Sequence, residues 1–263
     1  MAYKYEIGYA LSGGFIKGFA HLGAIQALWE HHIKPEIIVG VSAGALAGAF
    51  IADGNEPYRC LDFFKGHTFR DLSKLSISAA GVFSLDPFVE FLKDNLKATR
   101  LEELSIPLIV VATDLDHGRS TLFRKGSIAE RVAASCAMPV MFIPRVIHGT
   151  TYVDGGVLKN LPVSFIRRQC QHVVAINVSP LQTPEYKKNI WSIAMRAYHF
   201  MFESNTLPER ELPDLLIEPI NLAGYSNREL EKAEEIFEQG YRIAQEAIHH
   251  NLQNFNQIWE IKE

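Results

Sequence analysis

The chain has 263 residues, of which 48% are hydrophobic and 21% charged, and this composition is typical of a packed globular protein. It excludes a disordered chain and a fibrous repeat. The net charge of −4 indicates no strongly basic surface, so nucleic acid is not expected as a partner.

The first predicted elements alternate between strand and helix. An apolar strand over 5–11 ends at Ser12-Gly13-Gly14, and helical periodicity follows over 15–30. A second apolar strand over 37–41 leads into an alanine-rich helix over 43–52. Fully apolar strands separated by helices are typical of a parallel sheet that is covered on both faces.

Helical segments are expected throughout 57–104, a stretch too long for a simple crossover between strands. One helix in it is predicted to begin at Asp86-Pro87, a capping residue followed by proline at the first helical position. Ligands bind beside the carboxyl ends of the strands in such folds. We therefore expect 57–104 to form a small helical cap near that edge of the sheet.

The second half of the chain continues the alternation, and no linker of low complexity divides it. We therefore expect one domain over residues 1–263, with a three-layer α/β/α fold and a mostly parallel central sheet. The remaining predicted elements are strands over 107–114, 120–123, 172–178 and 215–218, helices over 127–136 and 187–203, and a capping box at Ser226 to Glu229 that opens a long C-terminal helix.

Membrane and targeting segments are not favoured. The uncharged stretch over 7–16 loosely resembles a signal peptide, but cleavage would remove a predicted strand and its glycine turn. The uncharged run over 37–52 is shorter than the ~20 residues that span a bilayer. The cysteines, Cys60, Cys136 and Cys170, sit in apolar stretches typical of buried inert thiols, and a reducing, cytoplasmic location fits them.

Gly40-Val41-Ser42-Ala43-Gly44 forms a G-x-S-x-G motif between a predicted strand and a predicted helix. A serine on such a turn takes a strained backbone conformation, and the flanking glycines remove β-carbons that would collide. The turn places the hydroxyl at the positive end of the helix, where an oxyanion is stabilised. We predict that Ser42 is a nucleophile. The alternative is a glycine turn whose only role is packing.

A second glycine turn covers residues 12–18, Ser12-Gly13-Gly14-Phe15-Ile16-Lys17-Gly18. Its free N–H groups are expected to point toward the carboxyl end of the sheet. A phosphate-binding P-loop is excluded because Phe19-Ala20 follow it, and a dinucleotide site because Phe15 replaces the middle glycine of that fingerprint. An oxyanion hole is the favoured interpretation, and a turn that only packs is the alternative.

Asp154 lies in a third glycine turn, Val153-Asp154-Gly155-Gly156. Asp-Gly is common in ordinary turns, but a serine nucleophile needs a base that takes its proton. The chain has ten histidines, of which His148 is the outside candidate because it lies six residues before Asp154. A carboxylate that is partly desolvated has a raised pKa and becomes a better proton acceptor, so Asp154 is favoured.

Together and in this order, the three turns resemble the patatin-like phospholipase family, whose members are lipid acyl hydrolases with a Ser-Asp dyad. The resemblance runs from about Tyr5 to Ile248. It implies an acyl-Ser42 intermediate, Asp154 as base and a backbone oxyanion hole. Further matches are Cys136-Ala137-Met138-Pro139, Asn160-Leu161-Pro162 and Gly240-Tyr241. The family's pattern maps the oxyanion hole onto Gly13, Gly14 and Phe15, with Lys17, Gly18, Gly40, Gly44, Gly155 and Gly156 as supporting turn positions.

Phe15 departs from the family's pattern, which usually has a third consecutive glycine there. Phenylalanine still has an N–H to donate, but a positive φ at this position would be strained. Its ring would also crowd the acyl site. We therefore expect Phe15 to shorten the acyl pocket.

The expected function is a serine acyl-ester hydrolase that acts on phospholipid, lysophospholipid or a smaller lipid ester. A catalytically silent lipid-binding module of the same fold is one alternative, which the Phe15 substitution leaves open. An α/β-hydrolase with a Ser-His-Asp triad is another, although its nucleophile usually lies deeper in the chain. The run from Asp114 to His117 is too sparse for a metal site, so neither a metal nor a cofactor is expected.

Two segments, 190–202 and 79–92, are richer in large apolar residues than one buried face needs, and we predict that they shape access to the site. In the first of them, large side chains are spread around the expected helix: Trp191, Met195, Phe200 and Phe202. A core helix, a contact between two copies of the chain and peripheral contact with a membrane all stay open for it.

Overall fold

The computed structural model describes residues 3–78, 80–180, 186, 188–222, 225 and 230–258, without the side chains of 77, 78, 191, 221 and 252–258. The predicted capping box at 226–229 lies outside these residues, as does residue 79.

Five strands form the parallel part of the central sheet. In spatial order they are β11 (Leu215–Ile217), β10 (Cys170–Ile176), β1 (Tyr5–Leu11), β2 (Ile37–Val41) and β5 (Leu108–Asp114). The four longer ones match strands that the apolar runs predict, within two residues at each end. The carboxyl ends of β1 and β2 therefore lie side by side, and the first two glycine turns follow them directly.

Three antiparallel strands extend the sheet beyond β5. β6 (Arg119–Phe123) and β9 (Thr150–Asp154) both pair with β5, and β8 (Arg145–Ile147) pairs with β9. The sequence predicts β6 but not β8 or β9, because their short polar segments carry no apolar run. The sheet is thus mixed but mostly parallel, and Asp154 ends one of its strands.

Successive residues of the buried strands alternate between two hydrophobic clusters, as expected for strands covered on both faces. In β5, Leu108 and Val110 belong to one cluster, whereas Ile109 and Val111 belong to the other. The second cluster is closed by the chain that follows β9, through Leu161, Val163 and Ile166. Short 3₁₀ turns therefore cover part of that face.

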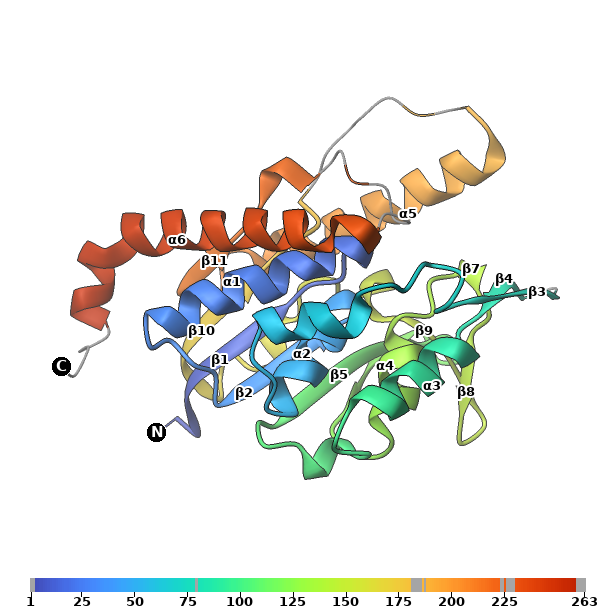
Figure 1. Ribbon diagram of the computed structural model, residues 1–263, viewed down its shortest axis with the longest axis horizontal. Helices are drawn as coiled ribbons and strands as arrows, with labels where there is room; N and C mark the ends of the chain where they lie inside the picture. The colour runs from blue at the N-terminus through green and yellow to red at the C-terminus, as the bar shows by residue number, and fades with distance from the viewer. Residues whose placement is uncertain are drawn as a thin grey trace.

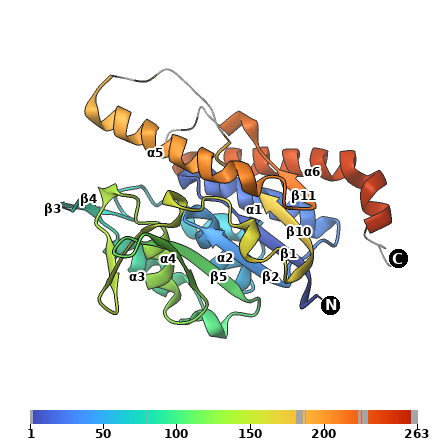
Figure 2. The same ribbon diagram turned by 180° about the vertical axis from the view of Figure 1, so that it is seen from behind.

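Helices flank the sheet. The long helix α6 (Ala233–Ile258) runs alongside α1 (Phe19–Glu30) (Figure 1). Helix α1 in turn contacts α2 (Ala43–Ala52). Seen from behind, α5 (Ile190–Thr206) crosses in front of α1 (Figure 2). α4 (Ile128–Ser135) packs against β5 and β9. This arrangement confirms the predicted three-layer fold.

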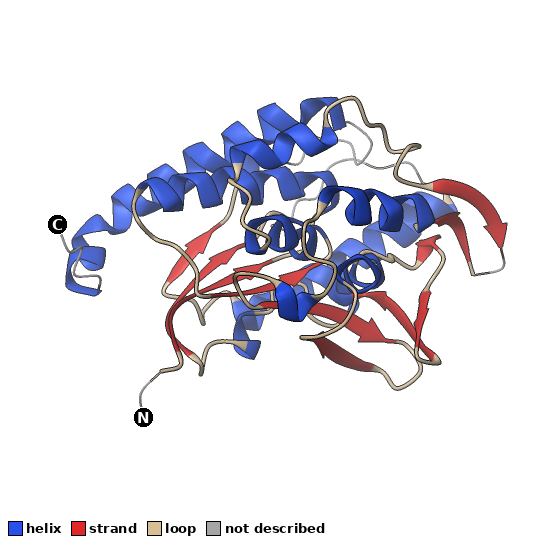
Figure 3. Cartoon of the chain, turned by 60° about the horizontal axis from the view of Figure 1, so that its bottom comes forward, coloured by secondary structure: helices blue, strands red, loops and turns tan. Residues whose placement is uncertain are grey.

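The segment 57–104 differs from its prediction as a wholly helical cap. A 3₁₀ helix (Tyr58–Phe64) and α3 (Asp86–Asn95) flank a hairpin of β3 (Lys74–Ser78) and β4 (Gly81–Ser84). β4 pairs with β7 (Val140–Phe142), which gives a second, three-stranded sheet beside the first (Figures 1 and 3). The helical prediction is wrong there because these strands are short and the partner of β4 lies far along the chain.

The other differences are small. The predicted helix over 15–30 begins with a 3₁₀ turn, Phe15–Gly18, before α1 starts at Phe19. α3 begins at Asp86, so Leu85 is its N-cap residue and Pro87 lies within the first turn. Within the described part of the chain, every helix is too short or too polar to cross a bilayer.

Candidate active site

Ser42 occupies a strained turn between β2 and α2. It is the N-cap residue of α2, with φ 51° and ψ −118°, a conformation that is costly for a residue with a side chain. The turn is closely packed, because a β-carbon on Gly44 would lie 2.4 Å from the carbonyl oxygen of Leu11. A β-carbon on Gly40 would likewise lie 2.5 Å from the Gly44 carbonyl oxygen. The predicted strand–turn–helix geometry is therefore present around this serine.

Asp154 is almost completely buried, with 1% of its surface exposed. Burial raises the pKa of its carboxyl to about 7, against the smaller lowering effects of the Gly156 N–H and the Ser42 side chain. The Gly156 N–H donates to Asp154 Oδ1 over 2.8 Å. The structure thus brings the Ser42 side chain within reach of the Asp154 carboxyl and raises the carboxyl pKa, as the desolvation argument predicts.

The glycine turn after β1 lies directly beside Ser42, since a β-carbon on Gly13 would be 3.2 Å from Ser42 Cβ. Its N–H groups differ in their availability. The Gly13 N–H donates to Asn160 Oδ1 over 3.1 Å, so the prediction that Gly13 supplies a free donor is wrong. Within the described residues, the N–H groups of Gly14 and Phe15 donate to no other group. Two candidate oxyanion donors therefore remain.

Phe15 has the positive φ that its place in the turn predicts, 53°. This region of the Ramachandran plot is unfavourable for a bulky side chain. The ring of Phe15 also lines the pocket that opens at Ser42. The expected positive φ of this residue is therefore confirmed, and the shortening of an acyl pocket by its ring stays a prediction.

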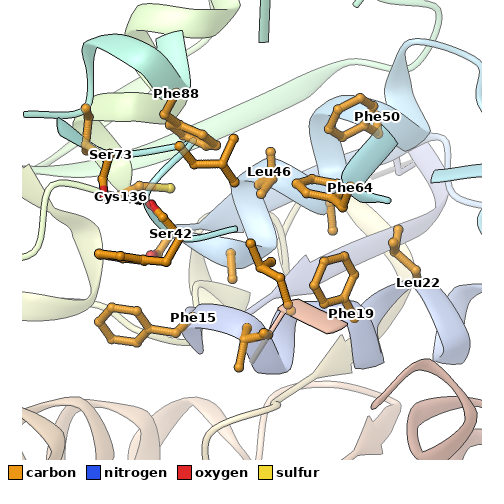
Figure 4. A pocket seen from close by; sticks show the side chains of 18 of the residues that line it. Phe15, Phe19, Leu22, Ser42, Leu46, Phe50, Phe64, Ser73, Phe88 and Cys136 are labelled. Carbon is orange, nitrogen blue, oxygen red and sulfur yellow. Dashed lines mark hydrogen bonds between the residues drawn. The ribbon is translucent and has the colours of Figure 1, made fainter. Parts of the chain in front are cut away.

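An apolar pocket extends from Ser42, with about 950 Å³ of empty space that includes its opening to solvent. Ser42 and Cys136 lie at one end of it, and Phe50 and Phe64 at the other (Figure 4). Leu85 and Phe88 of the segment 79–92 line it, and a role of this segment in access to the site stays a prediction. Helix α5 contributes none of its described side chains to this pocket.

The supporting positions gather around the same turns. Gly18 packs against Ala43, and Gly155 against the carbonyl of Val111. Lys17 is half-buried, and burial lowers its pKa. Lys17 and Arg196 both lower the pKa of His199 on α5, after the larger effect of burial, so two cations lie near that imidazole.

His148 is not brought to the site. It lies in the exposed turn between β8 and β9, at the opposite end of β9 from Asp154. The extended strand β9 spans roughly 13 Å from Thr150 to Asp154, which separates His148 from the carboxyl that it neighbours in sequence.

Four residues at the site carry no functional prediction from the sequence. Asn160 binds Gly13, and Ser135 binds the backbone of Ser42. Cys136 lies within hydrogen-bonding reach of the Ser42 side chain, and burial raises its pKa. On α5, the pKa of the Tyr198 phenol is raised by burial and, to a smaller extent, by the nearby charge of Asp154. The resemblance marks 136–139 and 160–162, and nothing local marks Tyr198.

Across the described ranges, no three His, Cys, Asp or Glu residues are grouped so that they could hold a metal ion. The polar groups around Ser42 are instead a carboxyl, backbone N–H groups and a phenol.

Comparison with known proteins finds relatives by sequence and a counterpart by fold. Residues 9–166 match the patatin-like phospholipase family. An uncharacterized NTE family protein of Mycobacterium tuberculosis is 36% identical over 60% of this chain and 45% of its own length. Lysophospholipase NTE1 of Kluyveromyces lactis is 25% identical over 96% of this chain but only 20% of its own length. The chain thus spans less than half of these relatives.

The fold has a counterpart among solved structures. The crystal structure of VipD from Legionella pneumophila superposes with a TM-score of 0.52 and 16% sequence identity, over 95% of this chain and 67% of that one. This likeness concerns the fold alone. Since the family match covers well over half of the chain and includes all three glycine turns, the chain belongs to the patatin-like phospholipase family.

Proposed function

We propose that this protein is a serine acyl-ester hydrolase in which Ser42 is the nucleophile and Asp154 the base. One observation carries the proposal: the side chain of Ser42, which lines an apolar pocket, lies within reach of a buried carboxyl whose pKa is about 7. A proton acceptor is most effective when its pKa lies near the working pH. At neutral pH this carboxyl is therefore suited both to take a proton and to return it.

The first half of the reaction forms an acyl-enzyme. The Ser42 hydroxyl gives its proton to Asp154 as its oxygen attacks the carbonyl carbon of the ester. The carbonyl oxygen becomes an oxyanion, and the N–H groups of Gly14 and Phe15 donate to it. The intermediate then collapses, the bond to the alcohol oxygen breaks, and the proton on Asp154 passes to that oxygen. The alcohol leaves, and the acyl group stays on Ser42.

The second half returns the enzyme to its starting state. A water molecule gives a proton to Asp154 as its oxygen attacks the acyl carbon. The same two N–H groups stabilise the second oxyanion. When this intermediate collapses, the bond to Ser42 breaks, the proton on Asp154 returns to the serine oxygen, and the carboxylic acid leaves. One carboxyl therefore serves both halves.

The shape of the pocket supports a lipid acyl chain as the group that Ser42 accepts. Ser42, Leu46 and Phe50 lie on one face of α2, over a helical rise of about 12 Å. Nearly all the other lining side chains are aliphatic or aromatic, so they favour an extended hydrocarbon over a polar acyl group.

The charge near the turn supports a phospholipid or lysophospholipid as the source of that chain. The half-buried ammonium group of Lys17 and the guanidinium of Arg196 lie near His199, close to the oxyanion turn. Such cations attract an anionic head group. A similar protein, from Kluyveromyces lactis, is named a lysophospholipase, and we propose the same substrate class here.

The alternatives predict a different arrangement. A silent lipid-binding module has no need of a desolvated carboxyl within reach of a strained serine. A Ser-His-Asp triad would require an imidazole beside Ser42, but His148 lies at the far end of β9, and the buried His21 already bonds to the Ser12 carbonyl over 2.8 Å. The dyad is therefore the arrangement that we propose.

A fluorophosphonate probe tests this function directly. We expect the probe to label the wild-type chain at Ser42, identified by mass spectrometry of its peptides, and to leave Ser42→Ala unlabelled. Wild-type protein should also hydrolyse lysophospholipid, and Ser42→Ala should not. A wild-type chain that is folded but neither labelled nor active on any ester would favour the silent lipid-binding module.

A further inference from the structure

Tyr198 lies on the face of α5 that covers the turn after Asp154. Its ring packs against that of Phe202, with 4.4 Å between the ring centroids. Phe202 in turn lies so close to Gly156 that a β-carbon there would be 2.4 Å from its Cζ atom. The Gly156 N–H is the group that donates to Asp154 Oδ1. Two packing contacts and one hydrogen bond therefore connect Tyr198 with the candidate base.

Helix α5 is held in this position by a polar contact as well. Asn205 Nδ2 donates to the carbonyl oxygen of Gly156 over 2.8 Å, and Asn205 Oδ1 accepts from the Asn160 N–H over 2.7 Å. Asn160 also binds Gly13. The helix that carries Tyr198 is therefore fixed to both the turn of the base and the oxyanion turn.

The hydroxyl of Tyr198 is buried, and no group among the described residues bonds to it. Buried polar groups are nearly always hydrogen-bonded, since leaving one unpaired costs the free energy of its desolvation. An unpaired donor that persists beside a reactive carboxyl suggests a partner that arrives with the substrate. Burial, with the added effects of Asp154 and Cys136, raises the pKa of this phenol, so it keeps its proton and can donate.

We infer that the Tyr198 hydroxyl donates a hydrogen bond to the alcohol oxygen of the bound ester, the oxygen that leaves when Ser42 is acylated. The inference rests on the proposed function. In that reaction Asp154 returns its proton to the leaving oxygen, so this oxygen must come within reach of Asp154. Tyr198 is a donor on the helix that packs against the turn after Asp154, whereas the N–H groups of Gly14 and Phe15 serve the carbonyl oxygen.

The step itself adds no proton transfer to Tyr198. As the bond between the acyl carbon and the alcohol oxygen breaks, its electron pair passes to that oxygen. The proton that neutralises this oxygen comes from Asp154. The phenol keeps its own proton and stabilises the developing negative charge, so its contribution grows as the leaving alcohol becomes more basic.

The test measures whether the loss of activity in Tyr198→Phe depends on the leaving group of the ester. Two esters of the same fatty acid are compared by kcat/KM, which reports the acylation half: a p-nitrophenyl ester, whose leaving oxygen needs little help, and a glycerol monoester, whose leaving oxygen is basic. Loss of one hydrogen bond in the transition state should cost about tenfold on the glycerol ester. The p-nitrophenyl ester should change by less than about twofold.

Tyr9→Phe is the matched control, because Tyr9 is another buried tyrosine, and its hydroxyl donates to the Ile33 carbonyl within the core. This variant should lower the Tm and leave the ratio of the two kcat/KM values unchanged. Tyr198→Phe should leave the Tm unchanged or raise it, because it removes an unpaired buried hydroxyl.

Two outcomes would overturn the inference: an equal loss on both esters, or no loss on the glycerol ester. Fluorophosphonate labelling of Ser42 separates these outcomes from failure of the proposed function. If Tyr198→Phe is labelled like the wild type but shows no dependence on the leaving group, the inference about Tyr198 is wrong and the Ser42 mechanism stands. If the wild type itself is not labelled, the proposed function fails.

Discussion

The backbone N–H of Ser42 donates to the hydroxyl of Ser135 over 2.7 Å. Ser135 ends α4, is fully buried, and its hydroxyl donates in turn to the Val111 carbonyl over 2.6 Å. A residue with a positive φ costs about 1–3 kcal/mol and persists only where its surroundings hold it. The Ser135 side chain therefore links the strained serine turn to β5 and holds it in place.

Replacing Ser135 with alanine should weaken both stability and catalysis. The change leaves the Ser42 N–H and the Val111 carbonyl without their partner, which costs about 1–3 kcal/mol for each buried group. We expect a lower Tm and a fall in kcat on ester substrates, because the Ser42 turn loses its support.

Ser127→Ala is the control, since Ser127 caps the other end of α4 by accepting from the Glu130 N–H. It should lower the Tm by a similar amount and leave kcat unchanged; an equal fall in kcat for both variants would contradict a specific role for Ser135.

Asp154→Asn should remove turnover while the chain stays folded. The amide can still accept from the Gly156 N–H but cannot take the Ser42 proton, so the rate should fall by roughly 10²–10⁴. His148→Ala serves as the comparison, because His148 is exposed at the far end of β9, and it should keep most of the activity. The reverse result, with Asp154→Asn active and His148→Ala inactive, would disprove the dyad.

The rate of acylation should rise with pH through about 7. The Asp154 carboxyl must be ionised to accept the Ser42 proton, and burial raises its pKa to about 7. Values of kcat/KM measured from pH 5 to 9 should therefore follow one ionisation in this range. A profile that is flat above pH 5 would mean that the reactive carboxyl is not desolvated as it is in the structure.

The free energy of unfolding should also depend on the ionisation of Asp154, but it should fall with rising pH where the rate rises. The unfolded carboxyl ionises near pH 4 and the folded one near pH 7, so the free energy of unfolding falls as pH rises across this interval. Asp154→Asn has no carboxyl at this position, so its free energy of unfolding should not fall in this way. It should match the wild type at pH 4 and exceed it at pH 8, by about 4 kcal/mol, in denaturant unfolding at both pH values. Equal stabilities at pH 8 would show that ionised Asp154 is not destabilising.

Phe15→Gly should shift the preference of the enzyme toward longer acyl chains. The ring of Phe15 lines the pocket next to Ser42, and its removal opens space there while the N–H at this position is kept. Glycine also relieves the strain of the positive φ. We expect the ratio of kcat/KM for long to short p-nitrophenyl esters to rise, and an unchanged chain-length profile would refute the steric role of the ring.

The exposed apolar side chains of α5 predict contact with a lipid surface. Ile190, Ile193, Phe200 and Met201 are all exposed on this helix. Ile193→Glu should reduce co-sedimentation with anionic liposomes, whereas Val146→Glu, an equivalent change at an exposed residue of β8, should not. Wild-type protein that does not bind liposomes but dimerises through α5 in solution would replace membrane contact by contact between two copies.

The local parts of the site could be predicted from the sequence. The strained Ser42 turn, the positive φ of Phe15 and the start of α3 at Asp86 depend on residues within a few positions of each other. Glycine, proline and apolar periodicity report such constraints directly, because backbone conformation is restricted by neighbouring atoms.

Only the tertiary structure decided which groups are free to react. Gly13 looks like a donor in the sequence, but its N–H is bonded to Asn160, 147 residues further along the chain. Ser135 lies 93 residues from the Ser42 N–H that it holds. The phenol of Tyr198 and the second sheet of β4 and β7 likewise depend on contacts between distant segments. A hydrogen-bonding group is used or left free according to what packs against it, and packing between distant segments leaves no periodic signal in the sequence.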